Sequence, residues 1–162
     1  SIDLLQKLLR KIILLLCCMD NVEILKKYAQ TNHFGKFLGL KLKVVDPGEV
    51  NYFVEVSQNH LATYQSAHGG FLAAVFDQIV GTAALTKAMS DHKLVSTVEF
   101  KINYLKPAYL NDKLKGVGKV LHHGKRLYTV EGQIFNHKQE LLVKGIATLN
   151  AYSYDKSDMK FL

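Results

Sequence analysis

This chain has little cysteine and none of the common signatures for a metal or a serine nucleophile. Its 162 residues include only two cysteines, the adjacent Cys17 and Cys18. Adjacent cysteines make neither a disulfide framework nor a CxxC metal pair, so the composition favours a reducing compartment, and we expect a cytoplasmic protein. No GxSxG elbow, HExxH helix or spaced set of histidines occurs. We therefore expect chemistry that needs no metal or redox cofactor.

The chain also lacks blocks of like charge, although its net charge is +7. The 21 Lys and Arg residues are dispersed among 14 Asp and Glu residues, without an Arg-rich arm. Such a pattern argues against nucleic acid as a partner and fits a phosphate-bearing ligand better. With 48% apolar residues, the chain has the composition of one globular domain with a real core.

No hydrophobic run near the N-terminus is long enough to span a bilayer. The apolar run 12–18 is short even for a secretory signal, so we expect no membrane span. We interpret residues 1–20 as a helical N-terminal extension and residues 21–162 as one domain. We favour Met19 as the natural start, with residues 1–18 as an upstream extension, and a lipoprotein-type signal is the alternative. The extension has an apolar face that needs a partner surface. That face consists of Leu4, Leu5, Leu8, Leu9, Ile12 and Leu15.

Proline is scarce, and the two prolines fall at predicted turns. Strands are predicted at 40–46 and 49–57, hinged at Pro47-Gly48. Before them we expect a short helix at 21–30 and a turn at 31–39; after them, a polar loop at 58–68. The second half of the chain alternates strand patterns with turn residues, including Pro107. The strands expected there are 93–105, 113–122, 126–136 and 141–152. Several strands contain glycine, which often marks a bend or a close backbone approach.

Between the two sets of strands lies a long apolar helix with one acid. From Gly69 to Leu85 the sequence reads GGFLAAVFDQIVGTAAL, in which Asp77 is the only charged residue. A helix this apolar is expected to be covered on nearly all sides, with an antiparallel sheet curled around it in an α+β fold. A buried carboxylate is costly, which points to a function for Asp77. Gly69 and Gly70 would leave backbone N–H groups open to a ligand at the helix start.

These features together resemble the hotdog-fold thioesterase superfamily, in its phenylacetate-pathway-type and human acyl-CoA thioesterase-like branch. The resemblance covers residues 34–152 and is carried by His68-Gly69-Gly70, by Asp77, and by the strand STVEFKINYLKPA at 96–108. It implies a hotdog fold, in which a curved antiparallel sheet wraps one central helix. It also implies hydrolysis of an acyl-CoA thioester, with coenzyme A bound as part of the substrate.

The resemblance implies roles for three residues. Asp77 falls at the catalytic carboxylate, which acts as general base or nucleophile. Gly69 falls where a backbone N–H polarises the thioester carbonyl, and Thr97 where a hydroxyl holds the attacking water. In the family the N–H and the carboxylate come from different subunits, so a homodimer is required, and pairing of dimers would give a homotetramer.

Further residues are predicted to bind substrate. In the loop and at the helix start these are Gln65, His68 and Gly70. Within the helix, Gly81 leaves space one turn after Asp77. In the hairpin turn between the strands expected at 113–122 and 126–136, Gly124, Lys125 and Arg126 are candidates to bind the phosphates of coenzyme A.

Two positions depart from the family pattern: Ala62 replaces an amide, and Gly81 replaces a hydroxyl. Thr63, Gln65 or Asn59 are candidates to replace the amide. Two other functions therefore stay open, a non-catalytic acyl-CoA-binding module and a hotdog hydratase or dehydratase that uses His68 with Asp77.

Overall fold

The fold is an antiparallel sheet that curves around one long helix. The computed structural model describes residue 25 and residues 27–153, so the predicted extension at 1–20 lies outside the described part. Six strands form one sheet in the order β1-β2-β4-β5-β6-β3, with every neighbouring pair antiparallel. The strands are β1 (Lys41–Asp46), β2 (Glu49–Glu55), β3 (Lys93–Tyr104), β4 (Lys113–His123), β5 (Leu127–Phe135) and β6 (Leu141–Ser153).

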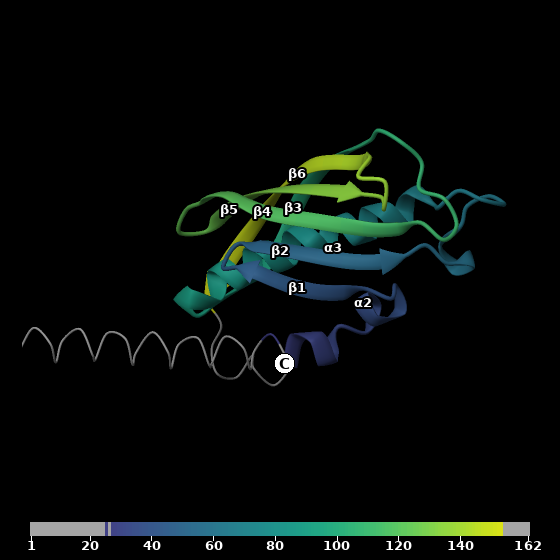
Figure 1. The fold of residues 1–162 in the computed structure, drawn as a ribbon. Helices are drawn as coiled ribbons and strands as arrows, with labels where there is room; N and C mark the ends of the chain where they lie inside the picture. The colour runs from purple at the N-terminus through teal and green to yellow at the C-terminus, as the bar shows by residue number, and fades with distance from the viewer. Residues whose placement is uncertain (1–24, 26, 154–162) are drawn as a thin grey trace, which may run out of the picture.

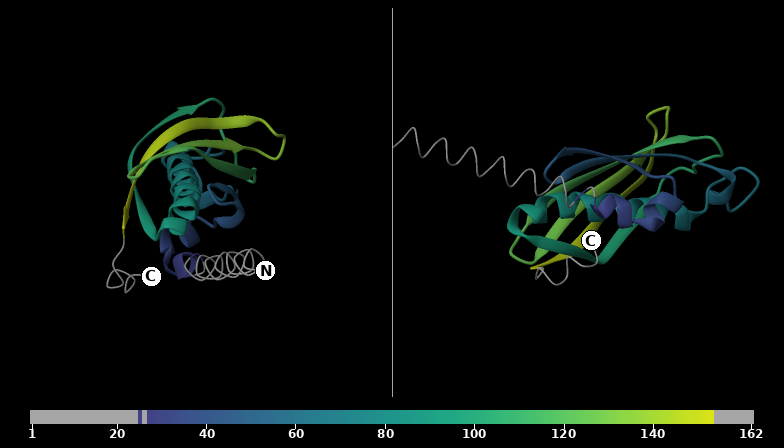
Figure 2. Two further views of the ribbon diagram at one scale, coloured as in Figure 1. Left: turned by 90° about the vertical axis from the view of Figure 1, so that its left-hand side faces the viewer. Right: turned by 90° about the horizontal axis from the view of Figure 1, so that it is seen from below.

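The central helix α3 (Gly69–Ala88) fills the concave face of this sheet. Seen along the helix in Figure 2, left, the strands curl over it on one side. Its apolar side chains form the core together with inward-facing residues of the strands. α3 is long and apolar enough to cross a membrane, but it is mostly buried within the molecule and is a core helix. The predicted α+β hotdog fold is confirmed (Figure 1).

Shorter elements complete the described chain. They are α2 (His33–Phe37) and the 3₁₀ turns η1 (Gln58–His60) and η2 (Met89–Asp91). Residues 27–31 are also helical. The six predicted strands and the long helix are present, with ends shifted by one or two residues. The predicted turn at 31–39 is wrong in part, because α2 forms there. The Asn32 side chain accepts a hydrogen bond from the Gly35 N–H at 2.9 Å and caps this helix, a signal that the glycines of the segment obscured.

Strand glycines let α3 lie unusually close to the sheet. A Cβ atom on Gly118 would lie 2.7 Å from Ile79 Cγ2 and 2.8 Å from the Ile79 carbonyl oxygen. A Cβ on Gly132 would lie 2.5 Å from Phe76, and one on Gly116 would overlap Ile79. The prediction of close backbone approach at these glycines is confirmed.

The loop before α3 is fixed by His60. Its backbone carbonyl accepts the His68 N–H at 2.7 Å, and its Nδ1 accepts the Ser57 N–H at 3.1 Å. The imidazole stacks on Phe71 of α3, with ring centroids 4.0 Å apart. Burial lowers the pKa of His60, because the charged ring loses hydration. The neutral ring therefore ties the loop to the first turn of α3.

We expect Gly118→Ala to destabilise the fold by about 1–3 kcal/mol, because the methyl group meets helix backbone that cannot move aside. Gly124→Ala is the matched control, since its Cβ would meet only the Leu127 carbonyl at 3.6 Å. Urea unfolding followed by circular dichroism measures both. Equal midpoints for the two variants would contradict the close-packing argument.

We expect the free energy of unfolding to fall as pH drops below about 6.5, in part through His60. A lowered native pKa means that the unfolded chain binds this proton more readily, so the contribution is complete above that pH and is lost below it. His60→Gln keeps an acceptor for the Ser57 N–H but does not titrate. Urea titrations at about pH 7.5 and about pH 5.5 should give a smaller pH effect in this variant than in wild type. An unchanged pH effect would exclude His60 as a source.

Candidate functional site

The central pair of the site is Asp77 on α3 and Thr97 on β3. The Thr97 hydroxyl donates a hydrogen bond to Asp77 Oδ1 at 2.8 Å. An ionised carboxylate only accepts, so the hydroxyl proton is committed to it, while the Thr97 oxygen keeps its lone pairs. A water molecule beside the pair can therefore donate one proton to Asp77 and the other to Thr97. A water held in this way keeps a lone pair that points away from the carboxylate and is free to act as a nucleophile.

Asp77 is less enclosed than its sequence context predicted. Asp77 is half-buried, and Thr97 is exposed. The expectation of a helix covered on nearly all sides was wrong for this face, because the sheet covers α3 on one side and ends at β3. The residues at positions 75, 76, 79 and 80, by contrast, are fully buried. Within one chain the acid thus faces an opening beside the edge strand.

A bulge in β3 decides which side chains face α3. Thr97 pairs with Leu149 and Glu99 with Thr148, so Val98 is an extra residue in the strand. The bulge shifts the alternation by one. Thr97 and Tyr104, which would face opposite sides in a regular strand, both reach α3 as a result. The sequence pattern of β3 does not reveal this shift.

The start of α3 is built around His68 and Gly69. His68 Nδ1 accepts the Gly70 N–H at 2.8 Å, so His68 is the N-cap of the helix. The expectation that both glycine N–H groups stay open is therefore wrong for Gly70, whose N–H is already used. Gly69 is exposed, and its N–H donates to no group among the described residues. Gly69 keeps the open donor that the resemblance implied.

Tyr104 is a residue of the site that sequence reasoning missed. Its hydroxyl donates to the Gly69 carbonyl at 3.0 Å and so holds the first peptide of α3 against β3. The tyrosine lies in the NYLKPA segment, but only the bulge turns it toward the helix.

Within one chain, Gly69 and Asp77 are too far apart to act on the same carbonyl. They are eight residues apart on one helix, which corresponds to about 12 Å along the axis. A reacting group would have to lie about 3 Å from both. The described chain therefore holds two half-sites, an N–H donor near one end of β3 and a carboxylate near its middle.

A pocket of about 180 Å³ opens beside the Asp77–Thr97 pair. Gly81 lines it, as expected for a small residue one turn after the acid. The remaining lining residues come from α3, from β3 and β6, and from the helical turn at 27–31; they are Tyr28, Gln78, Leu85, Val95 and Leu149. Tyr28 and Gln78 were not predicted, because nothing in the sequence places residue 28 beside α3.

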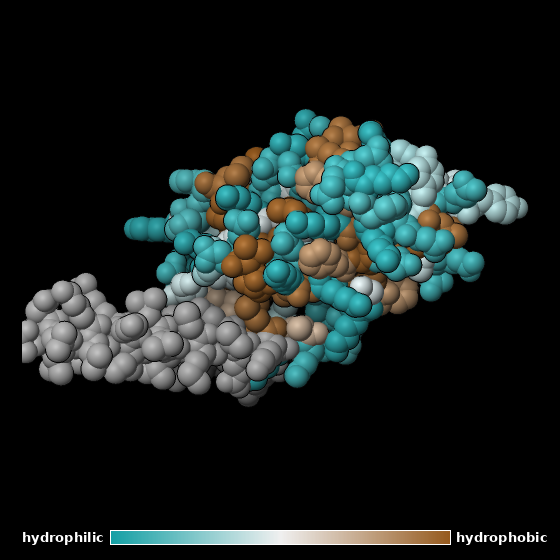
Figure 3. All heavy atoms as spheres, in the orientation of Figure 1, coloured by the Kyte–Doolittle hydropathy of each residue, from teal (hydrophilic) through white to brown (hydrophobic). Residues whose placement is uncertain are grey.

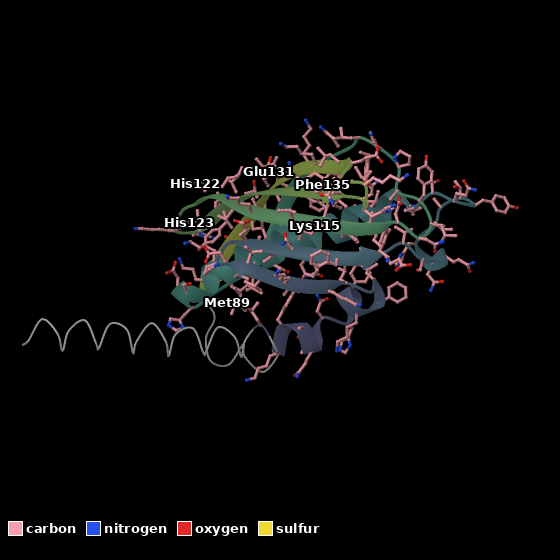
Figure 4. The ribbon with its side chains drawn as sticks, viewed as in Figure 1. Met89, Lys115, His122, His123, Glu131 and Phe135 are labelled. Atoms are coloured by element: carbon pink, nitrogen blue, oxygen red, sulfur yellow. The ribbon has the colours of Figure 1, made fainter. Side chains whose placement is uncertain are left out.

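The predicted contacts to coenzyme A at 124–126 are separated from β3 by the strand β6 in the single chain. Gly124, Lys125 and Arg126 form the exposed β4–β5 turn, and Lys93 Nζ donates to the Lys125 carbonyl at 2.9 Å. This turn follows His122 and His123, which Figure 4 shows at the same end of the molecule as Met89. It therefore lies near the start of β3, whereas Gly69 lies at the end of that strand.

The loop at 61–67 carries Gln65 and Ala62, both exposed. The backbone carbonyl of Gln65 accepts the Leu110 N–H at 2.8 Å, and the Ala62 N–H donates to the Ser66 carbonyl at 2.9 Å. Thr63 Oγ1 is engaged with Ser66 Oγ at 2.6 Å. The structure does not bring any of these side chains to Asp77 of the same chain. Among the described residues no cluster of three His, Cys, Asp or Glu side chains could hold a metal ion.

The comparisons with known sequences agree with this geometry. Residues 64–143 match the model of the thioesterase superfamily. Human acyl-coenzyme A thioesterase 13 is 31% identical over 106 residues, which are 65% of this chain and 74% of that relative. The Escherichia coli acyl-coenzyme A thioesterase PaaI is 27% identical over 105 residues, which are 65% of this chain and 72% of PaaI.

Solved structures share the fold. The E. coli PaaI protein from the phenylacetic acid degradation operon has a TM-score of 0.73 at 22% identity, over 82% of this chain and 94% of its own. A Streptococcus mutans protein bound to acetyl-CoA has a TM-score of 0.64 at 27% identity, over 72% of this chain and 91% of its own. The likeness to solved structures shows the hotdog fold. The human relative, 31% identical over 74% of its length, and the superfamily match show that the chain belongs to the thioesterase superfamily.

Proposed function

We propose that this protein hydrolyses an acyl-CoA thioester to the free acid and coenzyme A. The observation that carries the proposal is the hydrogen bond from Thr97 to Asp77, which leaves the carboxylate and one hydroxyl oxygen as acceptors for a single water. Relatives named acyl-coenzyme A thioesterases, and a neighbour bound to acetyl-CoA, support coenzyme A as the thiol of the substrate.

The chemistry needs a base and a donor for the developing oxyanion. Asp77 takes a proton from the water as its oxygen attacks the thioester carbonyl carbon. The Gly69 N–H, at the positive end of the α3 dipole, stabilises the oxyanion. When the tetrahedral intermediate collapses, the carbon–sulfur bond breaks, and the thiolate of coenzyme A takes the proton from Asp77. Direct attack by the carboxylate is the other route that the same residue allows.

The distance between the two half-sites supports a dimer. A second copy whose β3 pairs antiparallel with the first, about a two-fold axis near Phe100, would place Tyr104 of one copy opposite Thr97 of the other. Tyr104 holds Gly69, so this pairing brings the N–H donor of one copy to the carboxylate of the other.

The edge strand β3 is suited to such pairing. It has no hydrogen-bonded neighbour on its outer side in the described chain, and apolar side chains on it and just after it are exposed, among them Val98 at 59%. Exposed apolar side chains also occur on β1 and β2, where Figure 3 shows them interrupted by polar surface. A dimer is the minimum assembly that the proposal needs. A tetramer and a cytoplasmic location stay predictions from the sequence.

We expect Asp77→Asn to lower kcat by about 100-fold or more, because the amide cannot take the proton. Thr97→Val should lower kcat by about tenfold, because valine loses both the hydrogen bond from the water and the hydrogen bond to the Asp77 carboxylate. Release of free thiol from acetyl-, hexanoyl- and benzoyl-CoA measures both. Turnover of Asp77→Asn at the wild-type rate would exclude Asp77 as the base, and tight binding without turnover by wild type would favour the non-catalytic binding module.

We expect Gly69→Pro to lower kcat by about 100-fold while keeping the fold. Proline removes the N–H and adds a ring, and it is tolerated at the first helical position. A Cβ on Gly69 would lie 3.6 Å from the Tyr104 ring, an ordinary contact. His68 before it already has the extended backbone that proline requires, with φ −66° and ψ 136°. Circular dichroism should show unchanged helix content.

Mixing the two inactive variants tests the shared site. After co-refolding of Asp77→Asn with Gly69→Pro, mixed dimers contain one site with both groups intact, so about one quarter of wild-type activity should return. Each variant refolded alone is the control. No recovery in a sample that is demonstrably mixed would show that donor and carboxylate act within one chain.

A further inference from the structure

The pocket beside Asp77 lies between the helix α3 and the strand β3. Along α3, Asp77, Gly81 and Leu85 follow one another at intervals of four residues and therefore share one helix face. Opposite them, Val95 and Thr97 belong to β3. The pocket thus contains the reactive pair and continues along the helix past Gly81.

Gly81 keeps this space open. A Cβ atom at this position would meet no heavy atom within 4 Å, unlike the strand glycines, whose Cβ positions are already filled by the helix. Gly81 is therefore not required for packing within the described chain. Glycine inside a helix is destabilising relative to alanine, and an alanine side chain would fit at position 81. The presence of glycine there therefore points to a requirement for open space beside Asp77.

Tyr28 forms the wall of the pocket that belongs to neither α3 nor the sheet. It packs with Leu25 against a small apolar cluster at Leu85 and Met89, separate from the main core. Val95 lies against the same cluster and also lines the pocket. The Tyr28 ring thus covers the space between the second half of α3 and the start of β3.

Hydrogen bonds fix the Tyr28 ring in this position. The Gln78 side chain donates from Nε2 to the Tyr28 hydroxyl, and also to Thr82 Oγ1 at 3.3 Å. Asn32 Nδ2 donates to Gln78 Oε1 at 2.9 Å. Gln78 directly follows Asp77, so the residue that orients Tyr28 is adjacent in the chain to the proposed base.

The network extends into the core. Thr82 Oγ1 lies 2.9 Å from the hydroxyl of Tyr52, a buried residue of β2, and burial raises the pKa of that phenol. Tyr52 therefore stays protonated, as a hydrogen-bonding group that does not titrate under ordinary conditions. Tyr52 and Thr82 are buried, whereas Gln78, Asn32 and Tyr28 are half-buried. The hydrogen bonds from Gln78 to Thr82 and to Tyr28 connect the ring to this buried pair. Tyr28 is accordingly a fixed wall rather than a freely rotating side chain.

From this geometry we propose that Tyr28 limits the size of the acyl group, so that the site accepts short aliphatic or single-ring acyl groups and rejects long chains. The inference rests on the proposed thioesterase function. A closed apolar cavity of about 150 Å³ in another protein holds one benzene molecule. The pocket here measures about 180 Å³ within the single chain, a volume comparable with that of one ring, and the Tyr28 ring forms one of its walls.

The test compares acyl groups of increasing length on the 162-residue chain. Thiol release from butanoyl-, hexanoyl-, decanoyl- and benzoyl-CoA is measured for wild type, Tyr28→Ala and Tyr28→Phe. We expect wild type to prefer butanoyl-, hexanoyl- or benzoyl-CoA to decanoyl-CoA. Tyr28→Ala should raise the ratio of kcat/KM for decanoyl-CoA to that for butanoyl-CoA by about tenfold or more. Tyr28→Phe keeps the ring and should change the ratio by less than about threefold.

Gly81→Ala tests the same pocket from the opposite wall and does not depend on the N-terminal segment. The added methyl group has room and improves helix propensity, so the thermal unfolding midpoint should rise. It also narrows the pocket, so kcat/KM for benzoyl-CoA should fall by about tenfold while that for acetyl-CoA changes less.

The outcomes separate the inference from the function on which it rests. If wild type hydrolyses none of the acyl-CoAs, the proposed function fails. If wild type hydrolyses them but prefers decanoyl-CoA, or if Tyr28→Ala leaves the ratio of kcat/KM for decanoyl-CoA to that for butanoyl-CoA at its wild-type value, the function stands and the role of Tyr28 is overturned. An equal loss on all substrates in Gly81→Ala would contradict a pocket that selects by size.

Discussion

The close contact between α3 and the strands of the sheet is the constraint on which the rest of the structure depends. It exists because β4 and β5 present glycine where the helix presents Ile79 and Phe76, so the helix lies deeper in the sheet than side chains would allow. Because the sheet fixes the rotation of α3 about its axis, it also fixes the direction in which the opposite face of the helix points. Asp77 lies on the flank that faces β3, where the Thr97 hydroxyl reaches it.

The same rigid helix separates the two groups to which we assign the hydrolysis. The open N–H of Gly69 lies at the start of α3, and the carboxylate lies more than two turns further along. No side-chain movement closes such a gap within a straight helix. Two copies related by a two-fold axis can close it, because antiparallel pairing along β3 sets the end of one strand beside the middle of the other. In this arrangement, pairing along β3 both forms the dimer and completes the proposed site.

The helical segment before the sheet contributes to the pocket beside Asp77. Tyr28 and Asn32 attach to α3 through Gln78, next to the proposed base, and Tyr28 covers the pocket that Gly81 leaves open. The main core does not need this contact, since the cluster at Leu85 and Met89 is a separate one. A segment outside the sheet can therefore set substrate size without altering the helix or the strands.

The sequence by itself determined the elements and the main candidates. Period-two patterns and turn residues located the six strands, and the uninterrupted apolar run located α3, because these signals are local. Asp77 was identifiable as the one charge in that run, and Gly69 by its place before it. The strand glycines were correctly interpreted as points of close approach.

Only the tertiary structure decided which residues meet. The bulge at Val98 turns Tyr104 toward Gly69, which no alternation rule predicts, since one unpaired residue reverses the faces of a strand. Tyr28 joins the site through hydrogen bonds to Gln78, fifty residues away in sequence. The openness of Asp77 depends on where the sheet ends, which is a property of strand order. Local sequence encodes what each segment forms, whereas contacts between distant segments depend on the register and curvature of the whole sheet.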